Sequence, residues 1–222
     1  MKFQHLTSTL FMRLCLGVIL AAWSLAGQAE ALTPAQLVVQ STSDTLQREL
    51  QKDEYKRDFV KATQFVDHTI EPSVDFDRVS ALALGKHWKT ATPVQKDRFK
   101  KEFRTLLVRT YTTAFTEYAN WKIRYLPMLA DGESNKVLVK TEILQEGAQP
   151  SAVDYRMINS GGMWKVYDVL IEGISLLQNY RTEFGQEITQ TGSLDGVIDR
   201  IAKRNSTALK EPLKAETKAP GA

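Results

Sequence analysis

The sequence predicts an α+β domain in which a four-stranded antiparallel meander is covered by an N-terminal helical layer and by C-terminal helices. Two changes in the hydrophobic period indicate this order. Apolar residues recur every three or four positions up to about residue 118, alternate with polar residues from 121 to 172, and return to the helical period after 175. Because a sheet that buries one face needs a covering layer, the helices are expected to pack on the meander.

The first 29 residues are expected to be a cleaved signal peptide. Lys2 and Arg13 flank the start of the segment, an apolar run follows from 14 to 26, and small residues then stand at the spacing of a signal peptidase site. The apolar run is shorter than the roughly 20 residues of a membrane-spanning helix, although an uncleaved anchor is the alternative. The single cysteine, Cys15, lies in this segment, so no disulfide is expected in the mature chain.

Charge argues against nucleic-acid binding. The whole chain has 29 Lys and Arg against 26 Asp and Glu, and removal of 1–29 takes away two basic residues and leaves 27 against 26. A nearly neutral chain has no overall field that attracts nucleic acid. The remaining length suffices for a single domain, expected over 30–204, and the polar, proline-containing residues 205–222 are expected to be a disordered tail.

Capping motifs locate the main helices. Thr33-Pro34 and Thr92-Pro93 each offer a hydroxyl cap, proline at the first helical position and glutamine three residues after the cap. Ser175, with Gln178 three residues later, predicts another capped helix after the sheet. The expected helices span about 33–50, 57–70, 77–89, 92–118, 175–188 and 194–201.

The second half of the chain has four segments with strand character. They are rich in β-branched and aromatic residues, and the connections at 146–150 and 160–162 consist of turn-forming residues, which predicts consecutive hairpins. The expected strands span 121–125, 136–145, 151–159 and 163–172.

Catalytic and metal-binding motifs are absent from the sequence. His68 and His87 are the histidines of the mature chain, and they lack the three or four ligands that zinc usually takes. No nucleophile elbow, phosphate-binding glycine loop or catalytic cysteine occurs, so neither an enzyme nor a cofactor is expected. A small isomerase is the alternative, because one acid or phenol in an apolar pocket suffices there; Asp154, Tyr155 and Asp168 are its candidates.

Two stretches of the chain resemble the toluene-tolerance/MlaC family. Residues 168–184 (DVLIEGISLLQNYRTEF) are similar to the family's strand-to-helix signature. Residues 83–88 (ALGKHW), followed by the capping motif at 92 and the apolar stripe through Tyr111, form the second stretch. The same order of elements extends over about 33–204.

The resemblance implies a periplasmic carrier that binds a glycerophospholipid and shuttles it between the outer and inner membranes to maintain lipid asymmetry. The sequence leaves monomer or dimer open, and a monomer is favoured for a protein that must shuttle. It also implies two exchange partners, namely an outer-membrane lipoprotein–porin complex and an inner-membrane ABC transporter with a substrate-binding ring. A relative associated with hopanoid export leaves a hopanoid as the alternative cargo.

The resemblance further implies an interior that is incompletely filled and encloses an apolar lipid cavity. The candidate lining residues are those expected on the inward face of the sheet and on the long helix: Phe103, Leu107, Tyr111, Val137, Val139, Ile143, Val153, Tyr155, Met157, Val166, Leu170, Ile174 and Leu177. A solid core is the alternative, because a sequence records apolar character and not empty space. Arginine at Val139 or Val153 is therefore expected to reduce bound lipid without unfolding the protein.

Two residues of the last long helix are expected at the pocket mouth or at a partner contact. Tyr180 and Arg181 follow directly after the start of that helix. For Arg181, an ion pair with a nearby carboxylate is the alternative.

Overall fold

The computed structural model describes residues 31–117, 121–128 and 134–209. The described residues from Leu32 onward form one compact unit. The predicted signal peptide lies outside the described residues, as does the predicted tail from 210 onward. Within the described ranges, every helix is too short or too polar to cross a bilayer.

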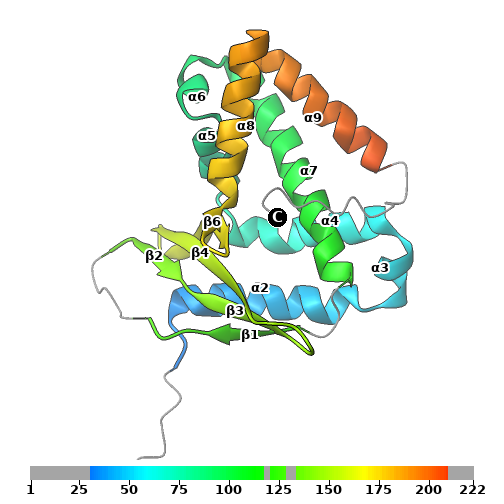
Figure 1. Ribbon diagram of the computed structural model, residues 1–222, viewed down its shortest axis with the longest axis vertical. Helices are drawn as coiled ribbons and strands as arrows, with labels where there is room; N and C mark the ends of the chain where they lie inside the picture. Colours follow the sequence, from blue (N-terminus) through cyan, green and yellow to red (C-terminus); the bar gives the residue numbers. More distant parts are fainter. Residues whose placement is uncertain (1–30, 118–120, 129–133, 210–222) are drawn as a thin grey trace, which may run out of the picture. The chain divides into compact units, whose positions relative to one another are not determined.

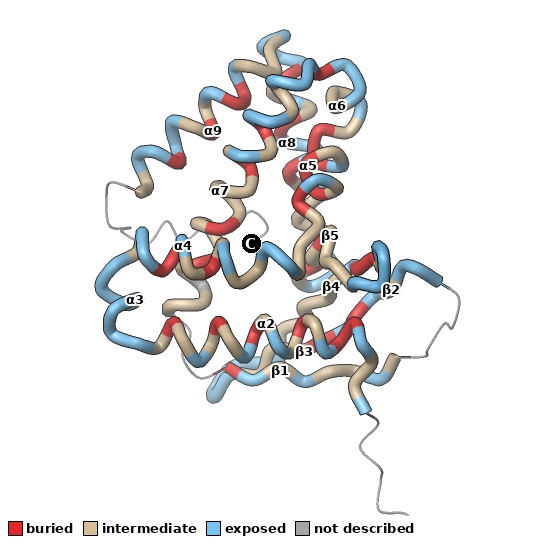
Figure 2. Tube along the Cα trace, turned by 180° about the vertical axis from the view of Figure 1, so that it is seen from behind, coloured by how far each residue is buried: buried red, intermediate tan, exposed pale blue. Residues whose placement is uncertain are grey.

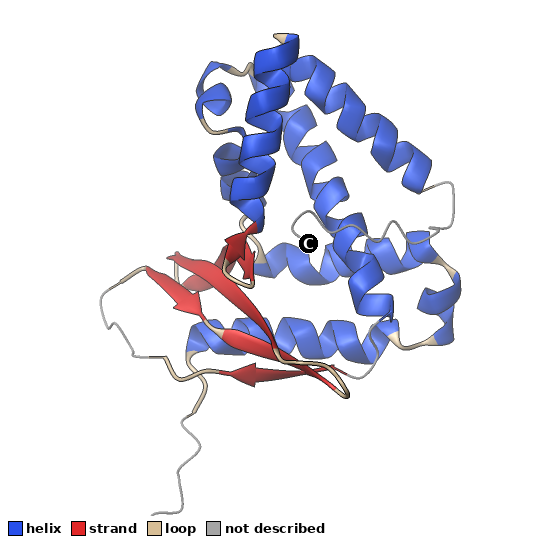
Figure 3. Ribbon diagram, in the orientation of Figure 1, coloured by secondary structure: helices blue, strands red, loops and turns tan. Residues whose placement is uncertain are grey.

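The strands form one antiparallel sheet (Figure 3), in which β1, β3, β4, β5 and β6 lie in that order and β2 pairs with β4 beside β3. The strands are β1 (Trp121–Tyr125), β2 (Lys136–Val139), β3 (Thr141–Gln145), β4 (Ser151–Ser160), β5 (Met163–Ile171) and β6 (Ile174–Ser175). The predicted α+β class and the antiparallel order are confirmed, but the sheet has six strands and not four.

The additional strands have local causes. The expected strand 136–145 is interrupted at Lys140, whose carbonyl accepts a hydrogen bond from the Leu126 amide at 3.0 Å, so β2 and β3 pair with different parts of β4. The two-residue β6 forms because the turn after β5 brings Ile174 back beside Ile171. The β4–β5 register also shifts between Arg156 and Met157, which leaves Tyr167 as an extra residue in β5.

The helices follow the predicted order with two divisions. They are α2 (Pro34–Leu50), α3 (Asp53–Arg57), α4 (Phe59–Ile70), the short 3-10 helix η1 (Glu71–Ser73), α5 (Phe76–Leu84), α6 (Lys86–Thr90), α7 (Pro93–Glu117), α8 (Leu176–Thr191) and α9 (Leu194–Ala208). Asp58 separates α3 from α4 and caps α4 by accepting the Lys61 amide at 2.9 Å. Gly85, at φ +54°, ends α5 and divides the expected helix 77–89.

Helix α9 continues past the domain boundary predicted at 204. Asn205 is buried and fixes this last turn on α7, because its amide donates to the Glu102 carbonyl at 2.9 Å and its oxygen accepts from Arg109 Nε at 2.9 Å. The residues from 205 to 208, assigned to the tail from their polarity, are therefore helical.

The helices form two groups around the sheet (Figure 1). Helix α2 lies along the sheet and α4 lies beside α2, whereas α5, α7, α8 and α9 pack on one another. Buried positions recur along the facing sides of these four helices, while α3 is largely exposed (Figure 2).

The buried apolar residues fall into three clusters. The four-helix cluster joins α5, α7, α8 and α9 and is centred on Phe99, Phe103 and Phe184. The α2–α4 cluster consists of Leu46, Leu50, Ala62, Val66, Phe76 and Val108. The α2–sheet cluster consists of Ala35, Val39, Val139 and Met157.

Candidate functional site

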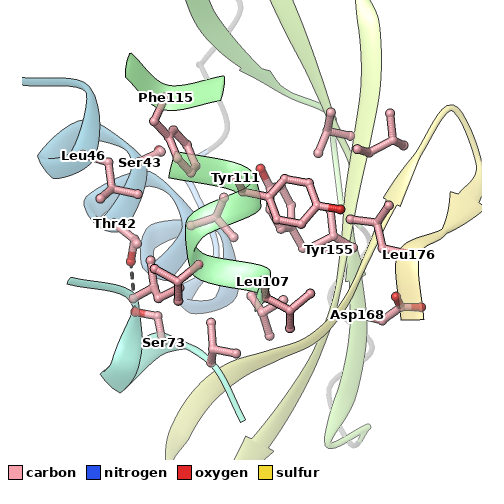
Figure 4. A pocket seen from close by; sticks show the side chains of 18 of the residues that line it. Thr42, Ser43, Leu46, Ser73, Leu107, Tyr111, Phe115, Tyr155, Asp168 and Leu176 are labelled. Atoms are coloured by element: carbon pink, nitrogen blue, oxygen red, sulfur yellow. Dashed lines mark hydrogen bonds between the residues drawn. The ribbon is translucent and has the colours of Figure 1, made fainter. Parts of the chain in front are cut away.

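A cavity of about 660 Å³ lies between the sheet and helices α2, α4 and α7 (Figure 4). Its volume falls within the range of about 300–1,000 Å³ that is usual for ligand sites. Its wall is almost entirely apolar. The helical side includes Val38, Val39, Leu46, Val66, Ile70, Phe76, Val79, Phe103, Leu107, Val108, Tyr111 and Phe115, and the sheet side includes Trp121, Ile143, Val153, Tyr155, Val166, Tyr167, Val169 and Ile171.

All three buried clusters contribute to this wall. Phe103 belongs to the four-helix cluster, Val108 to the α2–α4 cluster and Val39 to the α2–sheet cluster, and each also lines the cavity. In a solid domain, buried apolar residues usually form one contiguous core. The cavity therefore lies between the three clusters and is lined by all of them.

Few polar groups face this space. The hydroxyls of Thr42 and Ser73 are hydrogen-bonded to each other at 2.9 Å across the gap between α2 and η1, as Figure 4 shows. Tyr111 reaches into the cavity from α7 and Tyr155 from β4. Burial raises the pKa of both phenols above the ordinary value of 10, so both hydroxyls stay protonated at physiological pH.

Asp168 lies at the edge of the cavity, next to the start of α8 (Figure 4). Its side chain is only 2% exposed and is fully engaged in hydrogen bonds. It accepts from Arg156 at 2.9 Å, from the Ser175 hydroxyl at 2.7 Å and from the Leu177 amide at 3.1 Å. This carboxylate therefore joins β5 to α8, which is a structural role.

The geometry does not favour the isomerase alternative. Asp168 is held by three partners, and Asp154, which accepts from the Thr141 amide at 3.3 Å, lies outside the cavity wall. Tyr155 faces the cavity, but its raised pKa makes it a poor proton donor to a reacting group. Nowhere in the described ranges do three His, Cys, Asp or Glu side chains gather in a way that could hold a metal ion.

The structure brings most of the predicted lining residues to the cavity. The wall includes Phe103, Leu107, Tyr111, Ile143, Val153, Tyr155, Val166 and Leu177. Five predicted residues lie elsewhere, namely Val137, Val139, Met157, Leu170 and Ile174.

Three of these five are on the expected face but at its covered end. Val139 and Met157 are fully buried against Ala35 and Val39 of α2, and Val137 packs at the edge of the same cluster. The side-chain alternation was therefore predicted correctly. The error was to expect empty space where α2 packs directly on the sheet.

The other two are displaced by the backbone. The extra residue in β5 reverses the alternation after Val166, so Val169 and Ile171 line the cavity while Leu170 is buried away from it. Ile174 follows the turn into β6 and is 45% exposed.

The two residues expected at the mouth or at a partner contact take different positions. Tyr180 is 6% exposed, lines the cavity and packs edge-to-face on Phe103 at 5.1 Å between ring centroids. Arg181 is exposed on the outside of α8 and lies over Gly85, beside a surface hollow that also includes Lys86. No carboxylate among the described residues forms an ion pair with Arg181.

The predictions missed the contribution of the first helices. Helix α2 supplies Val38, Val39, Thr42, Ser43 and Leu46, and α4 supplies Val66 and Ile70. The signal was present, because the apolar residues of α2 recur at helical spacing on one face.

Comparison with known proteins identifies the family. The family model described as MlaC protein matches residues 40–203. The toluene tolerance protein ttg2D of Pseudomonas putida is 31% identical over 205 residues, which is 89% of this chain and 94% of that protein. The intermembrane phospholipid transport system binding protein MlaC of Haemophilus influenzae is 28% identical over 200 residues, which is 88% of this chain and 91% of that protein.

A solved structure has the same fold. The phospholipid-binding protein from Ralstonia solanacearum, determined in complex with a phospholipid, superposes with a TM-score of 0.73 and 32% sequence identity over 81% of this chain and 100% of that one. Because the family model matches well over half of the sequence, this chain belongs to the MlaC protein family.

Proposed function

We propose that this protein is a carrier that binds a glycerophospholipid in the cavity and moves it between membranes. The observation that carries the proposal is the apolar cavity of about 660 Å³ between the sheet and helices α2, α4 and α7. The phospholipid in the complex of the Ralstonia protein, and the phospholipid transport system to which the Haemophilus relative belongs by name, support the same cargo.

The free-energy cost of exposing acyl chains to water explains why a lipid needs such a cavity. Two acyl chains hold about 30 methylenes, and at about 0.8 kcal/mol each their exposure to water costs on the order of 20 kcal/mol. A lipid therefore needs a protein that covers its chains while it crosses an aqueous space. The cavity wall, built from aliphatic and aromatic side chains, offers that cover.

The energetics of the protein also favour an occupant. Side chains that line an empty apolar cavity have no packing partners on that side and lose the dispersion contacts of a filled core. An acyl chain in this space would replace the missing packing between the three clusters.

The family and the N-terminal sequence support a proposal for the site of action and the exchange partners. We infer that residues 1–29 direct export and that the carrier works in the periplasm as a monomer. Its exchange partners would be an outer-membrane lipoprotein–porin complex and an inner-membrane ABC transporter with a substrate-binding ring. The name of the Haemophilus relative, an intermembrane transport binding protein, supports this placement.

Native mass spectrometry tests the proposal directly. The mature protein is purified from periplasm without detergent, weighed intact and then extracted with organic solvent. A stoichiometric mass excess identified as phospholipid is the expected result. A hopanoid would keep the carrier and change the cargo, whereas a bare polypeptide that also fails to take up phospholipid from vesicles would refute the proposal.

A further inference from the structure

A second hollow, of about 470 Å³, lies on the outside of α8 and shares no described residue with the cavity wall. It opens where the start of α6 lies beside α8 (Figure 1). Two cations, Lys86 and Arg181, line it together with hydroxyls and carboxamides of α8, among them Thr182 and Gln186, and with Gly185. None of the described residues that line this α8 hollow is acidic. Its chemistry therefore fits an anionic ligand.

The cations of the α8 hollow are not neutralised by the chain itself. Eight other arginines of the described ranges form ion pairs with carboxylates, whereas neither Lys86 nor Arg181 forms one with a described residue. The two carboxylates of α8, Glu183 and Glu187, both pair with Arg200 of α9, and Glu187 accepts from its Nε at 2.7 Å. Helix α6 has no acidic residue. The positive charge of the hollow is therefore available to another molecule.

The backbone at Gly85 gives Arg181 a defined place beside the hollow. A Cβ at Gly85 would stand 2.9 Å from Arg181 Nε, so the absence of a side chain there leaves room for the guanidinium. A guanidinium can bind a carboxylate through two parallel hydrogen bonds, and less conformational freedom is lost when its position is already restricted. Arg181 is therefore positioned for a carboxylate that the described part of the chain does not supply.

Gly185, in the middle of α8, indicates that the occupant comes close to this helix. Glycine is less favourable than alanine in the interior of a helix. A Cβ at Gly185 would meet no heavy atom within 4 Å apart from its chain neighbours and the adjacent helix backbone, so the packing of the described residues does not require a glycine here. The missing side chain instead leaves room for the backbone of a second molecule.

We propose that the α8 hollow is a docking site for an acidic segment of an exchange partner. This inference rests on the proposed carrier function. Lys86 and Arg181 bind carboxylates of the segment, and the carboxamides of α8 donate to and accept from its backbone beside Gly185. Leu177 and Tyr180 of the same helix line the cavity, so the partner docks one helix away from the cargo.

Charge and shape favour a protein segment over a membrane surface. The chain after residue 29 has 27 basic and 26 acidic residues, so it has no broad positive field that attracts an anionic bilayer. The two cations lie instead in a concave site, which fits a protruding segment better than a flat surface.

Purified exchange complexes test the inference. The mature protein is titrated against the outer-membrane and the inner-membrane complex, each in phosphatidylcholine nanodiscs, by biolayer interferometry. Lys86→Glu and Arg181→Glu should each weaken binding to at least one complex about tenfold or more, because a favourable ion pair becomes a like-charge contact. Gly185→Gln should weaken binding to the same complex but should not lower the urea midpoint of unfolding, since glutamine is the better helix former and has open space there.

Arg204→Glu is the matched control, because Arg204 is also an exposed arginine but lies on α9 outside the hollow. It should bind both complexes like the natural protein, and native mass spectrometry should find phospholipid in every variant. Unchanged binding by folded Arg181→Glu and Gly185→Gln, or an equal loss in Arg204→Glu, would overturn the docking site and leave the carrier intact.

Phosphatidylglycerol vesicles separate a protein partner from a membrane surface. If Arg181→Glu abolished binding to these vesicles and left both complexes bound, the α8 hollow would belong to a lipid surface and the docking proposal would be overturned. Absence of lipid from the natural protein, together with failure to take it up, would instead refute the carrier function on which the inference rests.

Discussion

Arginine at two valines of the same sheet face should have opposite consequences. Val139 is fully buried in the α2–sheet cluster, so Val139→Arg loses about 1.5–3 kcal/mol of side-chain burial and adds an unpaired buried charge that costs several kcal/mol more. The total approaches the 5–15 kcal/mol of a typical domain, and this variant should not fold. Val153 faces the cavity, so Val153→Arg replaces little packing and should fold.

The cost of Val153→Arg should appear in lipid binding. If the arginine displaces about four methylenes of an acyl chain, the affinity falls by about 3 kcal/mol, or roughly a hundredfold. Desolvation of the guanidinium when lipid enters would increase the loss. The sequence pattern predicts the same effect for Val139→Arg and Val153→Arg, whereas the structure predicts unfolding for the first and weaker lipid binding for the second.

Circular dichroism, urea unfolding and native mass spectrometry on the two variants measure this difference. Val94→Arg is the control, because Val94 is 67% exposed on α7 and is not part of the cavity wall. It should unfold at nearly the same urea concentration as the natural protein and carry the same lipid. Full lipid occupancy in folded Val153→Arg, or a native spectrum for Val139→Arg, would show that the division of this face into cavity and core is wrong.

Three further changes test the scaffold around the cavity. Gly85→Ala should lower the free energy of unfolding by about 1–2 kcal/mol, because Gly85 has φ +54°. A Cβ at this position would also stand 2.9 Å from Arg181 Nε, but most of the loss should remain when Arg181→Ala is added to Gly85→Ala. Full recovery of stability in that double variant would show that the clash with Arg181, and not the backbone conformation, causes the loss. Asp168→Ala should cost about 2–4 kcal/mol in urea unfolding, since it leaves partners of a buried carboxylate unpaired, and a cost below 1 kcal/mol would contradict the role given to this side chain. The hydrogen bond from Ser151 holds the pKa of Glu172 below 4.5, so Glu172 stabilises the fold above that pH and this contribution is lost as the pH falls through its folded-state pKa. Glu172→Gln should therefore be less stable than the natural protein at pH 7 and equally stable in strong acid, which unfolding measured across the pH range would check.

Local signals in the sequence predicted the elements well. The Thr33 and Ser175 caps form as expected, each with its side-chain oxygen accepting the amide three residues on, because a cap depends only on its own turn. The divisions at Gly85 and Lys140 were not predicted. Gly85 takes a backbone conformation that the helical pattern around it does not reveal, and Lys140 is fixed by a hydrogen bond from Leu126.

The site was harder to predict because strand register depends on the partner strand. Val166 was placed correctly, but the extra residue Tyr167 reverses the alternation and exchanges Leu170 for Val169 and Ile171 in the cavity wall. A bulge of this kind arises from the pairing with β4. The sequence of β5 alone does not show it.

The boundary between cavity and core depends on the placement of one helix. Val139 and Val153 lie on the same face of the sheet, and Val39 of α2 belongs both to the cluster that buries Val139 and to the wall of the cavity that Val153 lines. Where the first turns of α2 rest on the sheet, side chains fill the space. Beyond Val39 the wall passes to residues of the α2–α4 and four-helix clusters, which approach the cavity from other directions. Cavity-lining and core residues are both apolar because both are shielded from water, so the hydrophobicity of a residue does not show which of the two positions it takes. That position depends on the distances between the three clusters, which no single segment of the sequence determines.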